Sequence, residues 1–291
     1  SVAAFSDGAL ADFSVAITDD NVVEVTENLL ATINNLVDQG RSIRLAGPGV
    51  ITITDADQAS LTINDVTFIE GDGDKTLVQL TVTLDTEVDV PVTVDYLTAV
   101  GTATSATTGV SGDQDYLDSS GQLTFVGQAG EQQKISVYVN GDNVVEATEA
   151  LSVGLSTVSA SGRDVIISDD TGVLTITNDD TAVLSIESAS STTEGSDGQL
   201  VVTLSNPVDE NVTYTFTTVD TGDATAGVDY TTTTDADVAA TVVTFSNLDG
   251  ADLSKTILVP TTADNVVELD EDFDLTISAP ATDASVQASV T

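Results

Sequence analysis

One acidic motif occurs three times in this chain of 291 residues. It reads D-N-V-V-E-x-x-E and occupies residues 20–27, 142–149 and 264–271. Carboxylate oxygens are the ligands that Ca²⁺ prefers, and its shell of about six to eight oxygens tolerates irregular geometry. Carboxylates from separate loops can therefore hold the ion without a dedicated linear loop. The motif predicts a calcium site wherever folding brings further acidic loops beside it.

Two interpretations without a metal remain open for the same residues. The acids could be ordinary solvated turn residues, which a chain this acidic contains in number. In the second copy, Asp142 and Asn143 could also close an Asx turn, with Val144 as a core anchor. That turn would explain half of the motif without any ion.

The missing residue types exclude several kinds of site. The chain contains no Cys, His, Met or Trp. A thiol nucleophile, a disulfide framework, the usual zinc site and a Ser-His-Asp triad are therefore excluded. Paired carboxylates could serve glycoside hydrolysis, but only 4% of residues are aromatic and no Trp offers a sugar platform. We expect a protein that is not an enzyme.

The charge of the chain restricts its partners. Acidic residues number 48 against 6 basic ones, for a net charge of −42. Such a chain repels phosphate backbones and anionic lipid, so we expect no nucleic-acid partner. The sequence has no apolar run of the length that spans a bilayer, which predicts no membrane insertion. Because 41% of residues are hydrophobic and many alternate with polar ones, we expect a folded protein.

The elements that position the motif are short strands. The three copies are evenly spaced, since 142 − 20 and 264 − 142 both equal 122, a period typical of tandem immunoglobulin-sized domains. Between copies, alternating segments such as 77–84 and 134–139 are bounded by turn residues. No segment has a helical period. The fold class predicted is all-β, with tandem antiparallel β-sandwiches of immunoglobulin-like form.

Three units follow from this period. Residues 1–58 contain only the later strands of a unit, including an expected strand at 13–17. Residues 59–180 form a complete unit, and residues 181–291 form one that lacks its last strand. No linker separates the second unit from the third, so neighbouring domains must abut. We expect the chain to be an internal segment of a longer repetitive protein; the alternative is strand donation between copies.

The motifs together resemble the Calx-beta domain family. They are G-x-A-T at 101–104, an Asp-Tyr pair at 115–116, L-T-F at 123–125, the acidic motif, and I-T-x-D-D at 176–180. The resemblance covers two nearly whole domains and half of a third. It implies sandwiches of seven to eight strands that bind calcium through acidic loops at one end, as in tandem repeats of large extracellular bacterial proteins.

The resemblance also implies a set of calcium ligands. In the first unit they are Asp19, Asp20, Glu24, Glu27, Asp55 and Asp57; in the second, Glu70, Asp115, Asp142, Glu146, Glu149, Asp179 and Asp180; in the third, Glu194, Asp229, Asp264, Glu268 and Glu271. Family members often have two consecutive Asp at the start of the acidic motif. Gly141 and Ala263 replace the first of them here, which puts additional ions in those units in doubt.

Two functions fit this sequence. The first is a calcium-stiffened structural segment of an extracellular filament, stalk or adhesin at the cell surface, whose partners are adjacent repeats of the same chain and other copies in the filament. The alternative is a set of regulatory calcium-sensing tandem domains attached to another module. The similarity of the repeats favours the first, because an extended stalk needs many equivalent units.

Overall fold

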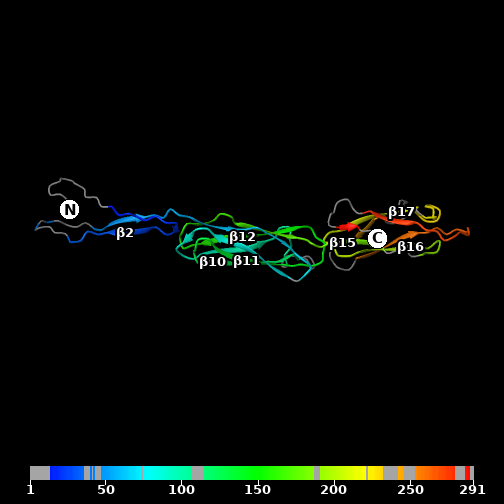
Figure 1. Ribbon diagram of the computed structural model, residues 1–291, viewed down its shortest axis with the longest axis horizontal. Coiled ribbons are helices and arrows are strands. Elements are labelled where there is room, and N and C mark those ends of the chain that lie inside the picture. The colour runs from blue at the N-terminus through cyan, green and yellow to red at the C-terminus, as the bar shows by residue number, and fades with distance from the viewer. Residues whose placement is uncertain are drawn as a thin grey trace.

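The computed structural model describes most of the chain, and every statement below concerns the described residues. They are 14–35, 40, 42, 47–73, 75–105, 114–186, 191–220, 222–231, 242–245, 253–278 and 286–288. Strands are the regular elements of this part of the chain, and in two units they form facing sheets around an apolar core. The predicted all-β fold of tandem sandwiches is therefore confirmed. The units follow one another along the long axis of the molecule (Figure 1).

The second unit is a sandwich of two five-stranded sheets. One has the strand order β13-β4-β6-β11-β9, and the other has the order β10-β8-β12-β14-β5. The strand bounds are β4 Ala59–Ile63, β5 Val66–Ile69, β6 Thr76–Leu84, β8 Val92–Ala99, β9 Tyr116–Leu117, β10 Ser120–Phe125, β11 Glu131–Val139, β12 Glu149–Ser159, β13 Val165–Ile167 and β14 Thr171–Thr177. A short strand, β7 (Glu87–Val88), lies outside both sheets.

The core of this unit follows from the alternation of its strands. Along β6 the side chains of Val78, Leu80, Val82 and Leu84 are buried, while those between them are at least partly exposed. Such alternation turns one face of each sheet toward the core. The buried residues of both sheets form one hydrophobic cluster.

The first strand of the unit crosses from one sheet to the other at Asn64 and Asp65. Before the crossing, β4 pairs with β6 in the antiparallel sense; after it, β5 pairs with β14 in the parallel sense. The side chains of both residues accept hydrogen bonds from the backbone of neighbouring strands. Thr81 N of β6 donates to Asn64 Oδ1 (2.5 Å), and Val173 N of β14 donates to Asp65 Oδ1 (2.7 Å). The sandwich is thus antiparallel except at edge pairs, and β5 and β14 run toward the same end.

The third unit repeats this arrangement with fewer strands. Its sheets have the orders β19-β16-β15-β21 and β18-β17-β20. The strand bounds are β15 Ala182–Ile186, β16 Asp197–Leu204, β17 Val212–Val219, β18 Val242–Phe245, β19 Ser254–Pro260, β20 Asp274–Ser278 and β21 Val286–Ala288. The edge strand β21 pairs with β15 in parallel, as β13 pairs with β4.

The described part of the first unit is a hairpin with a short strand ahead of it. Strands β2 (Glu27–Ala31) and β3 (Gly49–Ile53) pair antiparallel, and β1 (Val22–Val23) pairs in parallel with β7 of the second unit. The strand expected at 13–17 is wrong for residues 14–17, which lie outside any strand, and Phe13 lies outside the described residues. The matching strand of the second unit, β11, pairs with β6. Among the described residues of the first unit, no strand pairs with residues 14–17 in this way.

A glycine is required at position 127, where the turn between β10 and β11 contacts strand β7. Its φ is +102°, and a Cβ there would lie 2.3 Å from the carbonyl oxygen of Val88. Val88 N donates to the oxygen of Gly127 (2.8 Å). Strand β7 therefore cannot move away from a larger residue at position 127 without losing this hydrogen bond.

Replacing Gly127 by Ala is expected to destabilise the second unit by more than the ordinary strain of a left-handed residue, which is about 1 kcal/mol. Gly130→Ala is the matched control, because its φ is +74° with no atom within 4 Å of the added Cβ. Calorimetric unfolding of both variants measures the difference. Equal melting temperatures would contradict the close approach at Gly127.

Candidate metal centre

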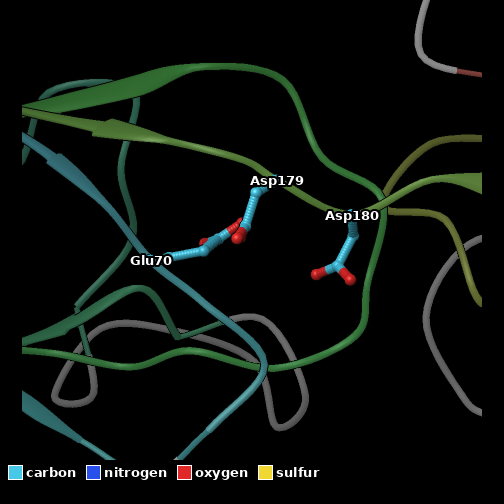
Figure 2. Close-up of side chains that lie close together, drawn as sticks. All are labelled: Glu70, Asp179 and Asp180. Carbon is cyan, nitrogen blue, oxygen red and sulfur yellow. The ribbon is translucent and has the colours of Figure 1, made fainter.

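The best-formed acidic site lies where β5 and β14 end side by side. The two strands are parallel, with Ile69 opposite Thr177, so the residues that follow them meet at one end of the sandwich. Glu70 N donates to the oxygen of Thr177 (3.2 Å), and Gly71 N donates to Asp179 Oδ1 (3.0 Å). Glu70, Asp179 and Asp180 each offer a carboxylate oxygen within 4.8 Å of the other two. Figure 2 shows these side chains between the strands, with Asp180 on the side of the third unit.

Two of these three carboxylates are buried with an oxygen that has no hydrogen-bond partner. Glu70 is 6% exposed and Asp180 is 8% exposed. Glu70 Oε1 and Asp180 Oδ2 are the buried oxygens concerned. A buried charged oxygen without a partner is costly, and a coordinated cation removes that cost. Hard oxygen donors that converge in this way fit Ca²⁺ or Mg²⁺ rather than a transition metal.

The electrostatics of the site are those of crowded, partly buried carboxylates. Burial is the largest cause and the charges of Asp142, Asp180, Asp115 and Asp179 act in the same direction, and together they raise the pKa of Glu70 to about 7. The pKa of Asp180 is also raised, first by burial and then by Asp72, Asp179 and Asp142. Every charge that acts on Glu70 here is another carboxylate. Like charges this close cannot all ionise cheaply without a counter-ion.

The acidic motif begins with the same turn in all three units. Val22 N donates to Asp20 Oδ1 (3.0 Å), Val144 N to Asp142 Oδ1 (2.7 Å), and Val266 N to Asp264 Oδ1 (2.6 Å). The Asx turn considered from the sequence is therefore present. It uses one carboxylate oxygen of each Asp, which leaves the other for a ligand. The core anchor, however, is Val145, which is buried, rather than the half-buried Val144.

The Gly at 141 has a steric reason. A Cβ at this position would lie 2.0 Å from the carbonyl oxygen of Gly71 and 2.6 Å from that of Glu70. The turn after β5 therefore occupies the space that an Asp side chain would need. In the third unit Ala263 occupies the same position, and a Cβ on Gly195 would lie 2.7 Å from the Ala263 Cβ.

Asp115 and Asp229 are held by equivalent hydrogen bonds. Thr104 N donates to Asp115 Oδ2 (2.5 Å), and Thr225 N donates to Asp229 Oδ2 (2.7 Å). Both Asp residues precede a buried Tyr that packs in the core. These bonds fix the carboxylates at the same end of the sandwich as the acidic motif. Asp115 is close enough to act on the pKa of Glu70 but is not part of the three-residue cluster.

The third unit brings its predicted residues into two adjacent clusters. Glu194, Asp264 and Glu268 form one, and Asp229, Glu268 and Glu271 form the other. Glu268 belongs to both, so a bridging carboxylate between two ion positions is geometrically available. Burial and neighbouring acids raise the pKa of Glu268 and of Glu271, although both side chains are exposed.

The predicted residues of the first unit come close but do not form a three-residue cluster within the described chain. Burial followed by Asp55, Asp19 and Asp20 raises the pKa of Asp57. Glu24 N donates to Asp55 Oδ2 (3.0 Å). Where the second unit has Asp179, this unit has Ala56, which removes one carboxylate from the end of β3.

Two of the three remaining predicted ligands lie at strand starts. Glu27 opens β2, and Glu149 opens β12, opposite Ile176 of β14. Glu146 is buried beside Val145. The structure therefore places all three groups of predicted residues at the ends of their units, but the assignment of individual ligands stays a prediction.

Three acids that contribute to the sites were missed from the sequence. Asp72 raises the pKa of Asp180, Asp223 raises that of Glu271, and Asp89 raises that of Glu24. Asp72 lies in the Gly-rich turn after β5, two residues from Glu70, and this position could have indicated it from the sequence. Asp89 belongs to the unit that follows Glu24, so no spacing within one repeat could have indicated it.

Comparison with known families assigns the fold. The model of the Calx-beta domain matches residues 4–67, 54–181 and 177–291, which is nearly the whole chain. The chain therefore belongs to the Calx-beta domain family and contains three tandem matches to it. Among curated proteins, no relative matches the chain significantly.

Several solved structures are similar to parts of the chain at low sequence identity. The apo form of the Calx CBD1 domain is 21% identical, with a TM-score of 0.35, and the match covers 43% of this chain and all of that one. CBD12 from CALX1.2 is 20% identical, with a TM-score of 0.35, over 77% of this chain and 82% of that one. CBD12 of CALX1.1, a calcium binding domain by title, is 19% identical over 76% of this chain and 82% of that one, with a TM-score of 0.35. In the described residues, no helix has the length and apolar character needed to cross a membrane.

The raised pKa of Glu70 predicts a pH dependence of the metal-free protein. Between the unfolded value near 4.5 and the folded value of about 7, the folded state binds more protons than the unfolded chain. In chelator, the free energy of unfolding of the second unit should therefore fall as pH rises through this range. Glu70→Gln should flatten that slope.

Asp95→Asn is the control for this experiment, because Asp95 lies in the middle of β8 and only accepts from Gln122 (2.8 Å), a bond that Asn preserves. Urea unfolding at several pH values measures the slopes. A Glu70→Gln variant with the wild-type slope would show that Glu70 is not the group whose proton is retained.

Proposed function

We propose that the chain is a calcium-stiffened structural repeat segment. The observation that carries this proposal is the cluster of Glu70, Asp179 and Asp180, with two buried oxygens that have no partner in the protein. It lies where the second unit passes into the third, because Ala182, which opens β15, is already buried in the core of the third unit. A divalent ion there neutralises carboxylates at the point where two domains meet.

Each residue of the site has a distinct role in holding such an ion. Asp179 is oriented by Gly71 N, which ties the end of β14 to the turn after β5. Asn178 closes its own turn, since Asp180 N donates to Asn178 Oδ1 and Asn178 Nδ2 donates to the oxygen of Asp180 (3.1 Å each). This turn directs Asp180 into the site. The protein thus supplies ligands that are preorganised by backbone hydrogen bonds, which lowers the entropy cost of binding.

The structural role is favoured over the sensing role by the direct junction. Asn206 Nδ2 donates to the oxygen of Thr181 (2.8 Å), so the connecting residue itself is bound to the third unit. A connection of this kind limits bending between units. Regulatory calcium sensing by tandem domains attached to another module remains the second candidate, since CBD12 of CALX1.1, which the chain resembles, is a calcium binding domain by title.

The setting we propose is extracellular or at the cell surface, in a filament, stalk or adhesin. Calcium-binding modules outside the cell work at dissociation constants of about 10⁻⁴ to 10⁻³ M, which irregular exposed sites such as those of the third unit can supply. A net charge of −42 also keeps parallel copies apart unless cations screen it. That the chain is not an enzyme stays a prediction.

Calcium is expected to raise the melting temperature. Saturation at about 100 times the dissociation constant adds roughly 2.7 kcal/mol per site. The readout is calorimetry in calcium and in chelator, at low magnesium. Asp180→Asn should reduce the gain, and Asp95→Asn should retain it. A melting curve that is the same with and without chelator would refute the proposal.

Calcium should also restrict bending at the junction between the second and third units. The site joins the end of β14 to the turn after β5 at the point where the chain enters the third unit, so occupancy removes freedom there. Small-angle scattering should show a longer and narrower distance distribution in calcium than in chelator. An identical maximum dimension in both would count against a role in stiffness while leaving calcium binding itself possible.

A further inference from the structure

The second valine of each acidic motif has a very different environment in the three units. Val23 is 0% exposed and Val145 is 2% exposed, whereas Val267, at the same position, is 99% exposed. The sequence around all three is D-N-V-V-E. Local sequence therefore cannot explain the difference, and the neighbours of each valine must.

The two buried valines do not belong to the core of their own unit. Val23 of the first unit is part of the hydrophobic cluster of the second, and Val145 of the second unit is part of the hydrophobic cluster of the third. Each valine therefore fills a position in the core of the next domain. Full burial of a valine is a substantial part of the stability of a small domain.

The backbone on either side of each valine is held in the same way at both junctions. At the first, Val22 and Val23 pair in parallel with Glu87 and Val88, and Asp89 N donates to the oxygen of Val23 (3.3 Å).

The second junction repeats these contacts. Val145 pairs in parallel with Val208, Val145 N donates to the oxygen of Pro207 (2.9 Å), and Asp209 N donates to the oxygen of Val145 (3.2 Å). The partner in both cases is a short segment just ahead of a long strand, residues 87–89 before β8 and residues 207–209 before β17, so the contact is a repeated joint.

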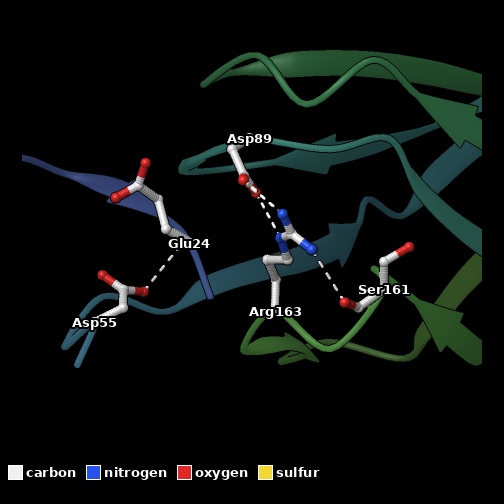
Figure 3. A network of polar contacts seen from close by, with 5 residues as sticks. All are labelled: Glu24, Asp55, Asp89, Ser161 and Arg163. Carbon is white, nitrogen blue, oxygen red and sulfur yellow. Dashed lines mark hydrogen bonds and ion pairs between the residues drawn. The ribbon is translucent and has the colours of Figure 1, made fainter. Parts of the chain in front are cut away.

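At the first junction a polar network surrounds this joint (Figure 3). Arg163 donates from Nε and Nη2 to the two carboxylate oxygens of Asp89 (2.6 Å each) and from Nη1 to the oxygen of Ser161 (3.1 Å). On the other side, Glu24 N is bound to Asp55. The arginine thus fixes the residue whose backbone N–H holds Val23.

We infer that the second valine of the acidic motif is a plug that completes the core of the following Calx-beta domain, and that Val267 is a free plug shaped for one further domain of this type. The occupant is the segment equivalent to residues 87–89 or 207–209. Leu269, two residues further on, is also exposed (89%). Both existing joints form through apolar burial and backbone bonds, so the inference does not depend on calcium.

A buried thiol can report the opening of one chosen domain, because the chain has no native Cys. Val202 is 0% exposed in the core of the third unit, and Cys is a small apolar replacement. In a Val202→Cys background, the rate of thiol labelling measures how often that core opens. All rates are taken in chelator, so that failure of this inference and failure of the calcium proposal are distinguished.

Val145→Asp should raise the labelling rate by about 10- to 100-fold, the range expected for the loss of one buried valine. Val267→Asp, the matched control at the same motif position, should leave the rate unchanged. Val145→Ala, which adds no charge, should raise the rate to a smaller extent and serves if the Asp variant does not fold. Equal rates for the Val145 and Val267 variants would overturn the plug.

An extended chain tests the free plug. The edge strands β13 and β21 pair with β4 and β15 in the same register, Val165 opposite Ala59 and Val286 opposite Ala182. Thr291 therefore corresponds to Asp170 in sequence, and residues 171–291 can be appended directly after it. They supply a closing strand and a fourth domain.

With the reporter Cys placed only in the appended copy, Val267→Asp should now raise the labelling rate by the same 10- to 100-fold. An unchanged rate would show that Val267 is not a plug. Loss of self-association in the unextended Val267→Asp chain, measured by sedimentation, would instead assign this surface to contacts between copies and would also overturn the inference.

Discussion

Crowding of carboxylates at the ends of the sandwiches is the constraint on which the rest of the structure depends. Glu70 is buried among acids and carries a pKa of about 7, far above that of a solvated carboxyl group. A protein normally avoids such an arrangement, because each buried charge without a partner lowers stability. Here the backbone enforces it, since the parallel pair β5 and β14 ends at one place and delivers three acids there. The arrangement is stable only with a proton or a cation.

The sequence was informative wherever a local rule decides the structure. Alternation predicted strands such as 77–84 within one or two residues of β6, and the Asx turn of Asp142 follows from its side chain alone. The candidate acids lie at strand ends for the same reason. What the sequence could not show is which acids meet. Asp179 joins Glu70 because two strands distant in sequence are parallel neighbours, and Asp89 reaches Glu24 across a domain boundary.

The prediction of Val144 as the core anchor of the acidic motif was wrong because contacts between distant segments decide which valine is buried. Val144 and Val145 are adjacent and chemically identical, so composition cannot distinguish them. The choice is made by the following domain, whose segment at Pro207 and Asp209 binds the backbone of Val145. Because Asp142 and Glu146 lie on either side of that valine, the segment that lines the acidic end of one domain also enters the core of the next. The candidate metal ligands and the joint to the next domain therefore share one short segment.

The direction of this joint has a consequence for synthesis on the ribosome. Translation proceeds from the N-terminus, and domains fold largely as units as they emerge. Val145 precedes the domain that it completes, so it is already outside the tunnel when strands β15 to β17 appear. Each new domain thus folds onto a finished neighbour that presents its missing core residue. If the core of each domain were instead completed by a residue of the domain that follows it, every nascent domain would keep an incomplete core until the next one had been made.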